Sequence, residues 1–209
     1  MRVLILGSTG GTGRELVRQA LELGHEVTAF VRDPSKLPIE HERLHIFKGN
    51  VLDPQALAEA VRGQNAVVSA LGTTNLGKSS EISEGTANVI RAMEAEGVKR
   101  LVFETTVGLG DSHDHLPWLA RVVFFPLVLK NVLADKEVQE KLVRESSLEW
   151  VLVRPARLTN GAARHKYRVD KEINEEARSK TISRADVAEF MLQQLANDTY
   201  LRRTPGVSY

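Results

Sequence analysis

The stretch Gly7-Ser8-Thr9-Gly10-Gly11-Thr12-Gly13 decides the fold of this chain, because it follows directly on the apolar run Val3–Leu6 and opens an amphipathic segment. This order predicts a strand, a tight turn and a helix. In such a turn Gly7 permits the bend, Gly10 lets the backbone approach a pyrophosphate, and Gly13 lets the helix pack closely on the strand. The motif therefore predicts a dinucleotide-binding βαβ unit, with the phosphates at the helix N-terminus. No Gly-Lys-Ser/Thr sequence follows the glycines, so the loop is not a P-loop.

Outward from this loop, strand patterns and helix patterns alternate along the chain. Strands are expected at Val3–Leu6, Glu26–Val31, Leu44–Phe47, Ala66–Ala70, Arg100–Phe103 and Trp150–Val153, with a further short one at Tyr167–Ile173. Helices are expected at Thr12–Leu23, from Asp53-Pro54 to Val61, at Glu81–Glu96, at Leu116–Glu145 with a kink at Pro126, and from a Ser183 cap to Leu195, with Asp186 as a capping-box-like partner. Short apolar strands alternating with helices predict an α/β fold, a Rossmann-like doubly wound, mostly parallel sheet with helices on both faces. We expect one domain over residues 1–209, with the substrate held by loops at the carboxyl ends of the strands.

Composition narrows the classes of partner. The chain has 209 residues, of which 28 are Lys or Arg and 27 are Asp or Glu, and a net charge of +1 argues against a concentrated basic face for nucleic acid. Cysteine is absent, which excludes disulfides, thiolate nucleophiles and zinc–cysteine sites. The uncharged run Val122–Leu129 is too short to span a bilayer, and the N-terminal apolar run is too short for a signal peptide. We therefore expect a cytoplasmic monomer or homodimer that binds a small molecule and neither nucleic acid nor membrane.

The end of the second predicted strand distinguishes between dinucleotides. An acid there binds the ribose hydroxyls of NAD, whereas an arginine accommodates the 2′-phosphate of NADP. The sequence here is Val31-Arg32-Asp33-Pro34-Ser35-Lys36. Arg32 comes first and Lys36 adds a second positive charge, so NADP is favoured. Asp33 keeps NAD open as the alternative.

Several segments in a fixed order resemble the atypical short-chain dehydrogenase/reductase family, especially its small NAD(P)H-binding members that include flavin and biliverdin-IXβ reductases. The matching segments are Gly7-x-x-Gly10-x-x-Gly13, Val31-Arg32-Asp33, Gly49-Asn50-Val51, Ala70-Leu71-Gly72 and Arg154-Pro155, with support from residues 83–88 and 143–148. The resemblance covers nearly the whole chain. Its cofactor segments are specific to the family, and its substrate segments are looser.

The resemblance implies cofactor-binding roles for the matching residues. Those implied for the pyrophosphate loop are Gly7, Ser8, Thr9, Gly10, Gly11, Thr12 and Gly13; for the 2′-phosphate, Arg32 and Lys36; for the adenine, Asn50 and Val51; for the nicotinamide and its ribose, Leu71, Gly72, Thr105, Thr106 and Lys136; and for the mouth of the site, Pro155 and Arg157.

The catalytic pair of the family is incomplete in this chain. Most relatives use Tyr-x-x-x-Lys on the helix before the sixth strand, with the tyrosine as proton donor. Lys136 is in place, but Val132 occupies the tyrosine position. A literal Tyr-x-x-x-Lys at Tyr167–Lys171 follows the sixth strand, and we interpret it as an exposed strand rather than a catalytic pair. Because carbonyl reduction needs a proton placed on the oxygen, the missing tyrosine argues against ordinary ketone or alcohol chemistry.

A planar conjugated acceptor tolerates this loss, since charge spreads over several heteroatoms that water can protonate. The sequence therefore predicts an NAD(P)H-dependent reductase that prefers NADPH and transfers hydride to a flavin, bilin or quinone, with Thr106 and Lys136 as candidate catalytic residues. One alternative stays open, a non-catalytic NADP(H)-binding redox sensor. Epimerase-like use of the cofactor on a sugar is disfavoured, because no sizeable C-terminal substrate domain is indicated. Residues 111–115, Asp-Ser-His-Asp-His, favour a polar lid loop over a metal site.

Overall fold

The computed structural model describes residues 1–73, 77, 80–106, 130–170 and 181–209. The strands are β1 (Arg2–Leu6), β2 (Glu26–Val31), β3 (Leu44–Lys48), β4 (Ala66–Ser69), β5 (Arg100–Glu104), β6 (Glu149–Pro155), β7 (Arg157–Thr159), β8 (Arg168–Asp170), β9 (Thr181–Ser183) and β10 (Gly206–Ser208). The helices are α1 (Gly11–Glu22), α2 (Pro54–Val61), α3 (Glu81–Glu96), α4 (Lys130–Glu145) and α6 (Arg184–Gln193), with a 3-10 helix, η1, at Pro34–Lys36.

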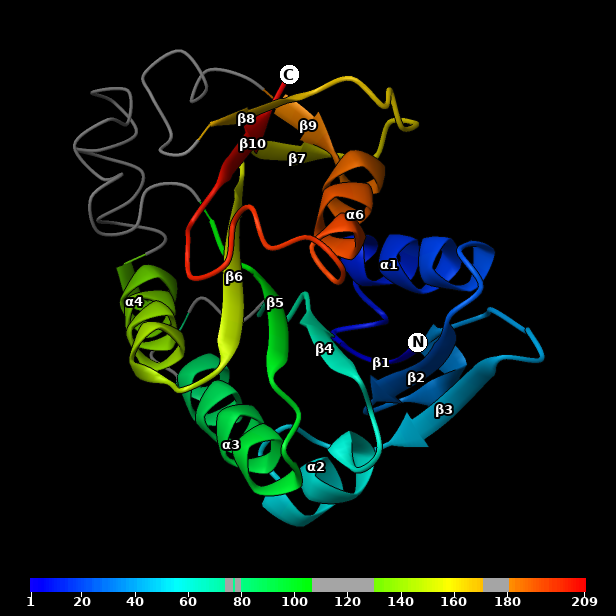
Figure 1. The fold of residues 1–209 in the computed structure, drawn as a ribbon, viewed down its shortest axis with the longest axis vertical. Coiled ribbons are helices and arrows are strands. Elements are labelled where there is room, and N and C mark those ends of the chain that lie inside the picture. The colour runs from blue at the N-terminus through cyan, green and yellow to red at the C-terminus, as the bar shows by residue number, and fades with distance from the viewer. Residues whose placement is uncertain (74–76, 78–79, 107–129, 171–180) are drawn as a thin grey trace.

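Eight of the ten described strands form one twisted sheet in the order β3-β2-β1-β4-β5-β6-β10-β8 (Figure 1). Neighbouring strands are parallel except for β10 and β8, which are antiparallel. A separate parallel pair joins β7 to β9. The strand order reverses between β1 and β4, and open α/β sheets bind their ligands outside the carboxyl ends of the strands at such a point.

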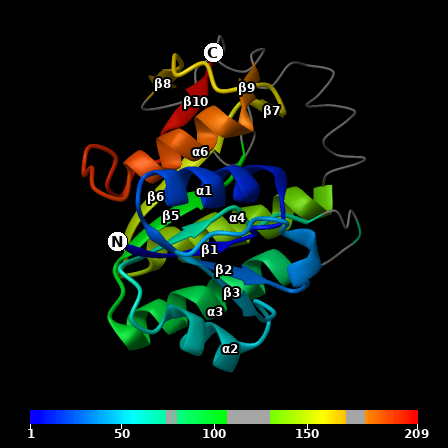
Figure 2. The same cartoon turned by 90° about the vertical axis from the view of Figure 1, so that its right-hand side faces the viewer.

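Helices cover both faces of the sheet, α1 and α6 on one face and α2, α3 and α4 on the other (Figures 1 and 2). The alternation of side chains along β1 shows why. Val3 and Ile5 belong to the apolar cluster under α1 and α6, while Leu4 and Leu6 belong to the cluster under α2 and α3. Because both faces of the strand are buried, its sequence is a continuous apolar run rather than an alternating one.

The predicted fold class is confirmed, a Rossmann-like, mostly parallel sheet with helices on both faces. Up to β6 the predicted elements agree with the described ones within one or two residues, apart from the start of the predicted helix Leu116–Glu145, which lies outside the described residues. The predicted Ser183 cap is confirmed, since Ser183 Oγ accepts from the N–H of Asp186 at 3.0 Å. At the start of α2, Asp53 Oδ1 accepts from the N–H of Gln55 at 3.0 Å and so caps the helix that Asp53-Pro54 was predicted to open. Asp186 departs from a capping box, since its carboxylate accepts from the Ser183 hydroxyl at 2.8 Å instead of from the Ser183 backbone.

Some observed strands were not predicted, and some predicted features fall outside the described residues. The strands β7, β9 and β10 were not expected, because three residues each give too little pattern to identify them. Within the predicted strand Tyr167–Ile173, the structure describes β8. The predicted lid residues 111–115 and the N-terminal part of the long helix, residues 116–129 with the kink at Pro126, lie outside the described residues.

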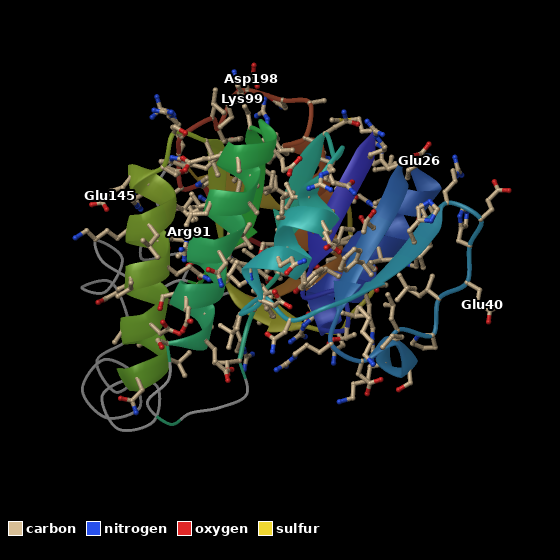
Figure 3. The ribbon with its side chains drawn as sticks, turned by 90° about the horizontal axis from the view of Figure 1, so that it is seen from below. Glu26, Glu40, Arg91, Lys99, Glu145 and Asp198 are labelled. Carbon is tan, nitrogen blue, oxygen red and sulfur yellow. The ribbon has the colours of Figure 1, made fainter. Side chains whose placement is uncertain are left out.

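Charged side chains of both signs lie around the outside of the molecule. Figure 3 labels six exposed examples, Glu26, Glu40, Arg91, Lys99, Glu145 and Asp198. Among the helices that the structure describes, none combines the length and the apolar character that crossing a bilayer requires.

Candidate cofactor-binding site

A cleft of about 650 Å³ opens at the carboxyl ends of β1 to β4. Four loops line it: the glycine loop after β1, the end of β2 at Arg32, the turn after β3 at Asn50 and Val51, and the segment after β4 at Leu71 and Gly72. The loops after β1 and β4 lie on either side of the reversal of strand order. The cleft is therefore where the fold predicts a ligand.

The glycine loop has the close contacts that its glycines were expected to permit. Gly7 has φ +74°, and a Cβ there would collide with the backbone of Ala70 at the end of β4. A Cβ at Gly13 would collide with the carbonyl group of Gly7. Ser8, which was predicted to bind the cofactor, does not line the cleft. Its hydroxyl is buried and donates to the Ile5 carbonyl at 2.6 Å.

The first turn of α1 is suited to an anion. Its N-cap residue, Gly10, provides no side-chain hydrogen bond, and the turn contains no acidic residue. Free N–H groups and the positive end of the helix dipole therefore face the cleft beside Thr9, Gly11 and Thr12. The glycines of this loop leave space that a Cβ would fill, so the backbone can come close to a ligand. The residues present therefore fit a bound pyrophosphate.

At the end of β2 the structure separates Arg32 from Asp33. Arg32 is exposed and lines the cleft. The Asp33 carboxylate caps η1, accepting from the Ser35 hydroxyl at 2.7 Å and from the Ser35 N–H at 3.1 Å. These hydrogen bonds, together with the positive charges of Lys36 and Lys48, hold the pKa of Asp33 below its ordinary value. Lys36 is not among the residues that line the cleft, and 69% of its side chain is exposed.

The turn after β3 is fixed from the side of α3. The Asn88 side chain donates to the carbonyl of Val51 at 3.0 Å, and Gly85 leaves room for the Val51 side chain. Asn50 accepts from the N–H of Leu52 at 3.1 Å and so stabilises its own turn. The two residues predicted beside the adenine are thus held rigidly at the cleft.

The residues predicted near the nicotinamide divide into two groups. Leu71 and Gly72 line the cleft, and a Cβ at Gly72 would have nothing within 4 Å, so the backbone there is open to a ligand. Thr105 is buried, donates its hydroxyl to Glu140 of α4 at 2.8 Å and does not line the cleft. Thr106 is partly exposed at the end of its described segment.

The predicted mouth residues do not line the described part of the cleft. Pro155 is buried and paired with Val207, and Arg157 is exposed in β7 opposite Thr181. The next residue, Leu158, lines the cleft in their place. Sequence reasoning missed Leu158 because β7 was not predicted.

A buried carboxyl, Glu104, lies behind the cleft at the end of β5. It accepts a hydrogen bond from the Thr12 hydroxyl at 3.1 Å and is only 8% exposed. Burial raises the pKa of Glu104, against the positive charges of Lys136 and Arg184 and the Thr12 hydrogen bond. Burial likewise lowers the pKa of Lys136, against the negative charges of Glu104, Glu140 and Asp135. The sequence contained a signal for Glu104, an acid directly after an apolar strand, but it was not singled out.

Lys136 is carried by α4, which is fastened at two buried points. Glu140 accepts from the Arg154 guanidinium at 3.1 and 2.7 Å, and both side chains are nearly inaccessible to solvent. Asp135 accepts from the N–H groups of Ile82 and Ser83 at 3.0 and 3.2 Å. The helix is therefore held rigidly against β6 and α3 while Lys136 faces the end of β5.

The literal Tyr-x-x-x-Lys lies elsewhere in the fold. The Tyr167 hydroxyl donates to Glu189 of α6 at 3.2 Å, and its ring contacts Phe190 edge-to-face. Tyr167 is therefore half-buried against α6 rather than exposed, and it is not among the described residues that line the cleft. Lys171 lies outside the described residues. Glu189 also contacts His165, which lies beside Asp186, so three possible metal ligands come together here. The Asp186 carboxylate, however, already accepts from Ser183 and from two backbone N–H groups.

Fold and site together define a Rossmann-like dinucleotide-binding protein, with the glycine loop at the strand reversal and an uncapped helix N-terminus above it. Residues 7–198 match the family described as NAD(P)H-binding, and the chain belongs to this family.

Two named relatives and one solved structure are similar to this chain. The chain is 30% identical over 165 residues to the photosystem II assembly factor Ycf39 of Synechocystis sp., covering 77% of this chain and 46% of that protein. It is 29% identical over 225 residues to the oxidoreductase dmxR7 of Cryptosporiopsis sp., covering 97% and 92%. The chain thus spans less than half the length of Ycf39 and most of dmxR7. The solved structure of ChuY from Escherichia coli O157:H7, described as an anaerobillin reductase, shares the fold with a TM-score of 0.82 at 23% identity, covering 100% of this chain and 97% of that one.

These comparisons confirm the predicted resemblance to the NAD(P)H-binding members of the atypical short-chain dehydrogenases/reductases, and the named relatives include an oxidoreductase. The roles of individual residues stay predictions.

Proposed function

We propose that this protein is a reductase that prefers NADPH and transfers hydride to a planar conjugated acceptor of the flavin, bilin or quinone type. The observation that carries the proposal is the composition of α4. The helix presents Lys136 to the end of β5, but one turn earlier, at the position from which relatives supply a proton-donating tyrosine, it has Val132.

Such a site can bind and orient but lacks the family's positioned proton donor. When bound, the nicotinamide nucleotide supplies the hydride. The glycine loop and the turns after β3 and β4 hold the nucleotide, and Lys136 provides positive charge beside its expected ribose. A conjugated acceptor spreads the added charge over several heteroatoms, so water can deliver the proton without a tyrosine. The likeness to ChuY, an anaerobillin reductase, supports an acceptor of this kind.

The preference for NADPH is supported by the end of β2. Recognition of NAD requires an acid that is free to accept from the ribose hydroxyls. Oδ1 of the Asp33 carboxylate is already engaged by Ser35 and Asp33 does not line the cleft, whereas Arg32 does. The described geometry therefore favours a 2′-phosphate over a free hydroxyl pair.

The proposal is tested by NADPH oxidation with the purified chain. FMN, biliverdin and menadione serve as planar acceptors, and a simple aliphatic ketone of matched solubility serves as the contrast. We expect turnover with at least one planar acceptor and none with the ketone. Reduction of the ketone with no planar acceptor reduced would overturn the proposal.

The alternative function, a non-catalytic NADP(H)-binding redox sensor, is also favoured by the valine at position 132. The same assay separates the two functions when it is combined with a direct measurement of NADPH binding. Tight NADPH binding with no oxidation by any acceptor supports the sensor and overturns the reductase.

A further inference from the structure

The side chain of Arg184, the first residue of α6, lies across the glycine loop. A Cβ built on Gly11 would be 2.5 Å from both Cδ and Nε of Arg184, so only a glycine at position 11 leaves room for this packing. Arg184 also lines the cleft, together with the loops that follow β1 to β4. A residue from near the end of the chain thus contributes to the site formed by its beginning.

The orientation of the guanidinium is fixed by the loop after β7. Arg184 donates from one terminal nitrogen to the Asn160 side-chain oxygen at 2.6 Å. An arginine has five N–H donors, so most of them remain for another acceptor. Within the described residues, Asn160 is the one hydrogen-bond partner of this guanidinium that the geometry gives.

The charges around Gly11 favour an anion at this place. Arg184 packs on Gly11 in the first turn of α1, so its charge lies close to the positive end of the helix dipole. This turn has no acidic residue and no side-chain cap. The Glu104 carboxyl interacts with Arg184 but is shared with Thr12 and Lys136. Two sources of positive potential are therefore incompletely balanced, and a bound anion would relieve their repulsion.

We propose that Arg184 binds the pyrophosphate of the nicotinamide dinucleotide, clamping it from above against the glycine loop, and that Asn160 is the positioning residue for the clamp. Arginine pairs with phosphate through two parallel N–H···O bonds, which suits a guanidinium already held in plane. The inference rests on NAD(P)H binding and not on the acceptor, so it can fail while the proposed reduction stands, and the reverse.

The test compares nucleotide affinities of the full chain by calorimetric titration. Arg184→Met should raise the Kd for NADPH and for NADH by the same factor, about 10- to 100-fold, because both contain the pyrophosphate. It should leave the Kd for adenosine 2′-monophosphate unchanged, since that probe has no pyrophosphate. Asn160→Ala should give a smaller loss for both dinucleotides.

The matched control is Arg18→Met, which removes one positive charge from an exposed position on α1 where Arg18 pairs with Glu15 and Glu22. We expect its dinucleotide affinities to equal those of the unaltered chain. Circular dichroism and melting curves establish that each variant is folded. Unchanged dinucleotide affinities in folded Arg184→Met, or weaker binding of adenosine 2′-monophosphate as well, would overturn the pyrophosphate assignment. A change in the KM for the acceptor alone would place Arg184 at the substrate instead.

Discussion

Arg32 is the residue that we propose distinguishes the two nicotinamide cofactors, because the neighbouring acid, Asp33, caps η1. Hydrogen bonds to a charged group contribute about 1.5–3 kcal/mol. We therefore expect Arg32→Ala to weaken NADPH binding by about 10- to 100-fold and to leave NADH binding nearly unchanged. Titration of both nucleotides measures the ratio. Asp33→Asn is the control, since it keeps an acceptor for Ser35; equal losses of NADPH and NADH in Arg32→Ala would refute the 2′-phosphate assignment.

Glu104 gives the molecule a predictable dependence on pH. Burial raises its pKa in the folded chain above the unfolded value, so the folded state binds more protons between these two values. The cost of burying the carboxylate is then fully present above the folded pKa and is relieved as the pH falls toward the unfolded value, about 4.3. We expect Glu104→Gln, which keeps an acceptor for Thr12, to raise the free energy of unfolding at neutral pH and to lose this advantage toward about pH 4.

Urea denaturation at a series of pH values measures this effect. Glu59→Gln, at an exposed position on α2, is the matched control and should track the unaltered chain. A Glu104→Gln variant that is less stable than the unaltered chain at every pH would mean that the attraction between Glu104 and Lys136 outweighs the cost of burial.

At the scale of an element, the N-terminus of α3 is capped from another helix. Its own N-cap residue, Ser80, makes no side-chain cap bond, whereas Asp135 of α4 accepts from two N–H groups of the first turn. Loss of a cap costs about 0.5–2 kcal/mol. We expect Asp135→Ala to lower the free energy of unfolding by about 1–2 kcal/mol and Ser80→Ala to change it by a few tenths at most. Denaturation of both variants decides; an equal cost for Ser80→Ala would contradict the assignment.

The two kinds of cap also show what a sequence can predict. Asp53 and Ser183 accept from N–H groups two or three residues further along the chain. Their positions directly before a helical pattern therefore identify them as caps. Asp135 accepts from the N–H groups of Ile82 and Ser83, which lie more than 50 positions earlier in the chain. No local pattern indicates that pairing. The packing of Arg184 on Gly11 has the same character. Residues that follow strands β1 to β4 were therefore predictable, while those brought to the site by tertiary packing were not.

At the scale of the whole molecule, the alternation of strands and helices was sufficient to predict the sheet, since right-handed crossovers leave few arrangements. The extension of the sheet by β10 and β8 was not, because strands of three residues are defined by their partners. This extension matters for the site. It belongs to the C-terminal part of the chain that also provides Leu158 and Arg184, so the cleft joins the two ends of the sequence.

Nucleotide binding should therefore stabilise the whole fold rather than one loop. A ligand that binds only the folded state adds RT ln(1 + [L]/Kd) to the free energy of unfolding, about 2.7 kcal/mol at a concentration of 100 Kd. We expect NADPH to raise the Tm of the unaltered chain in proportion to the logarithm of its concentration, with a single transition. In Arg32→Ala, NADPH should raise the Tm by a smaller amount, as expected from its higher Kd. The rise in Tm with NADH should stay the same. Two separate transitions, only one of them moved by NADPH, would show that the cleft does not couple the two ends of the chain.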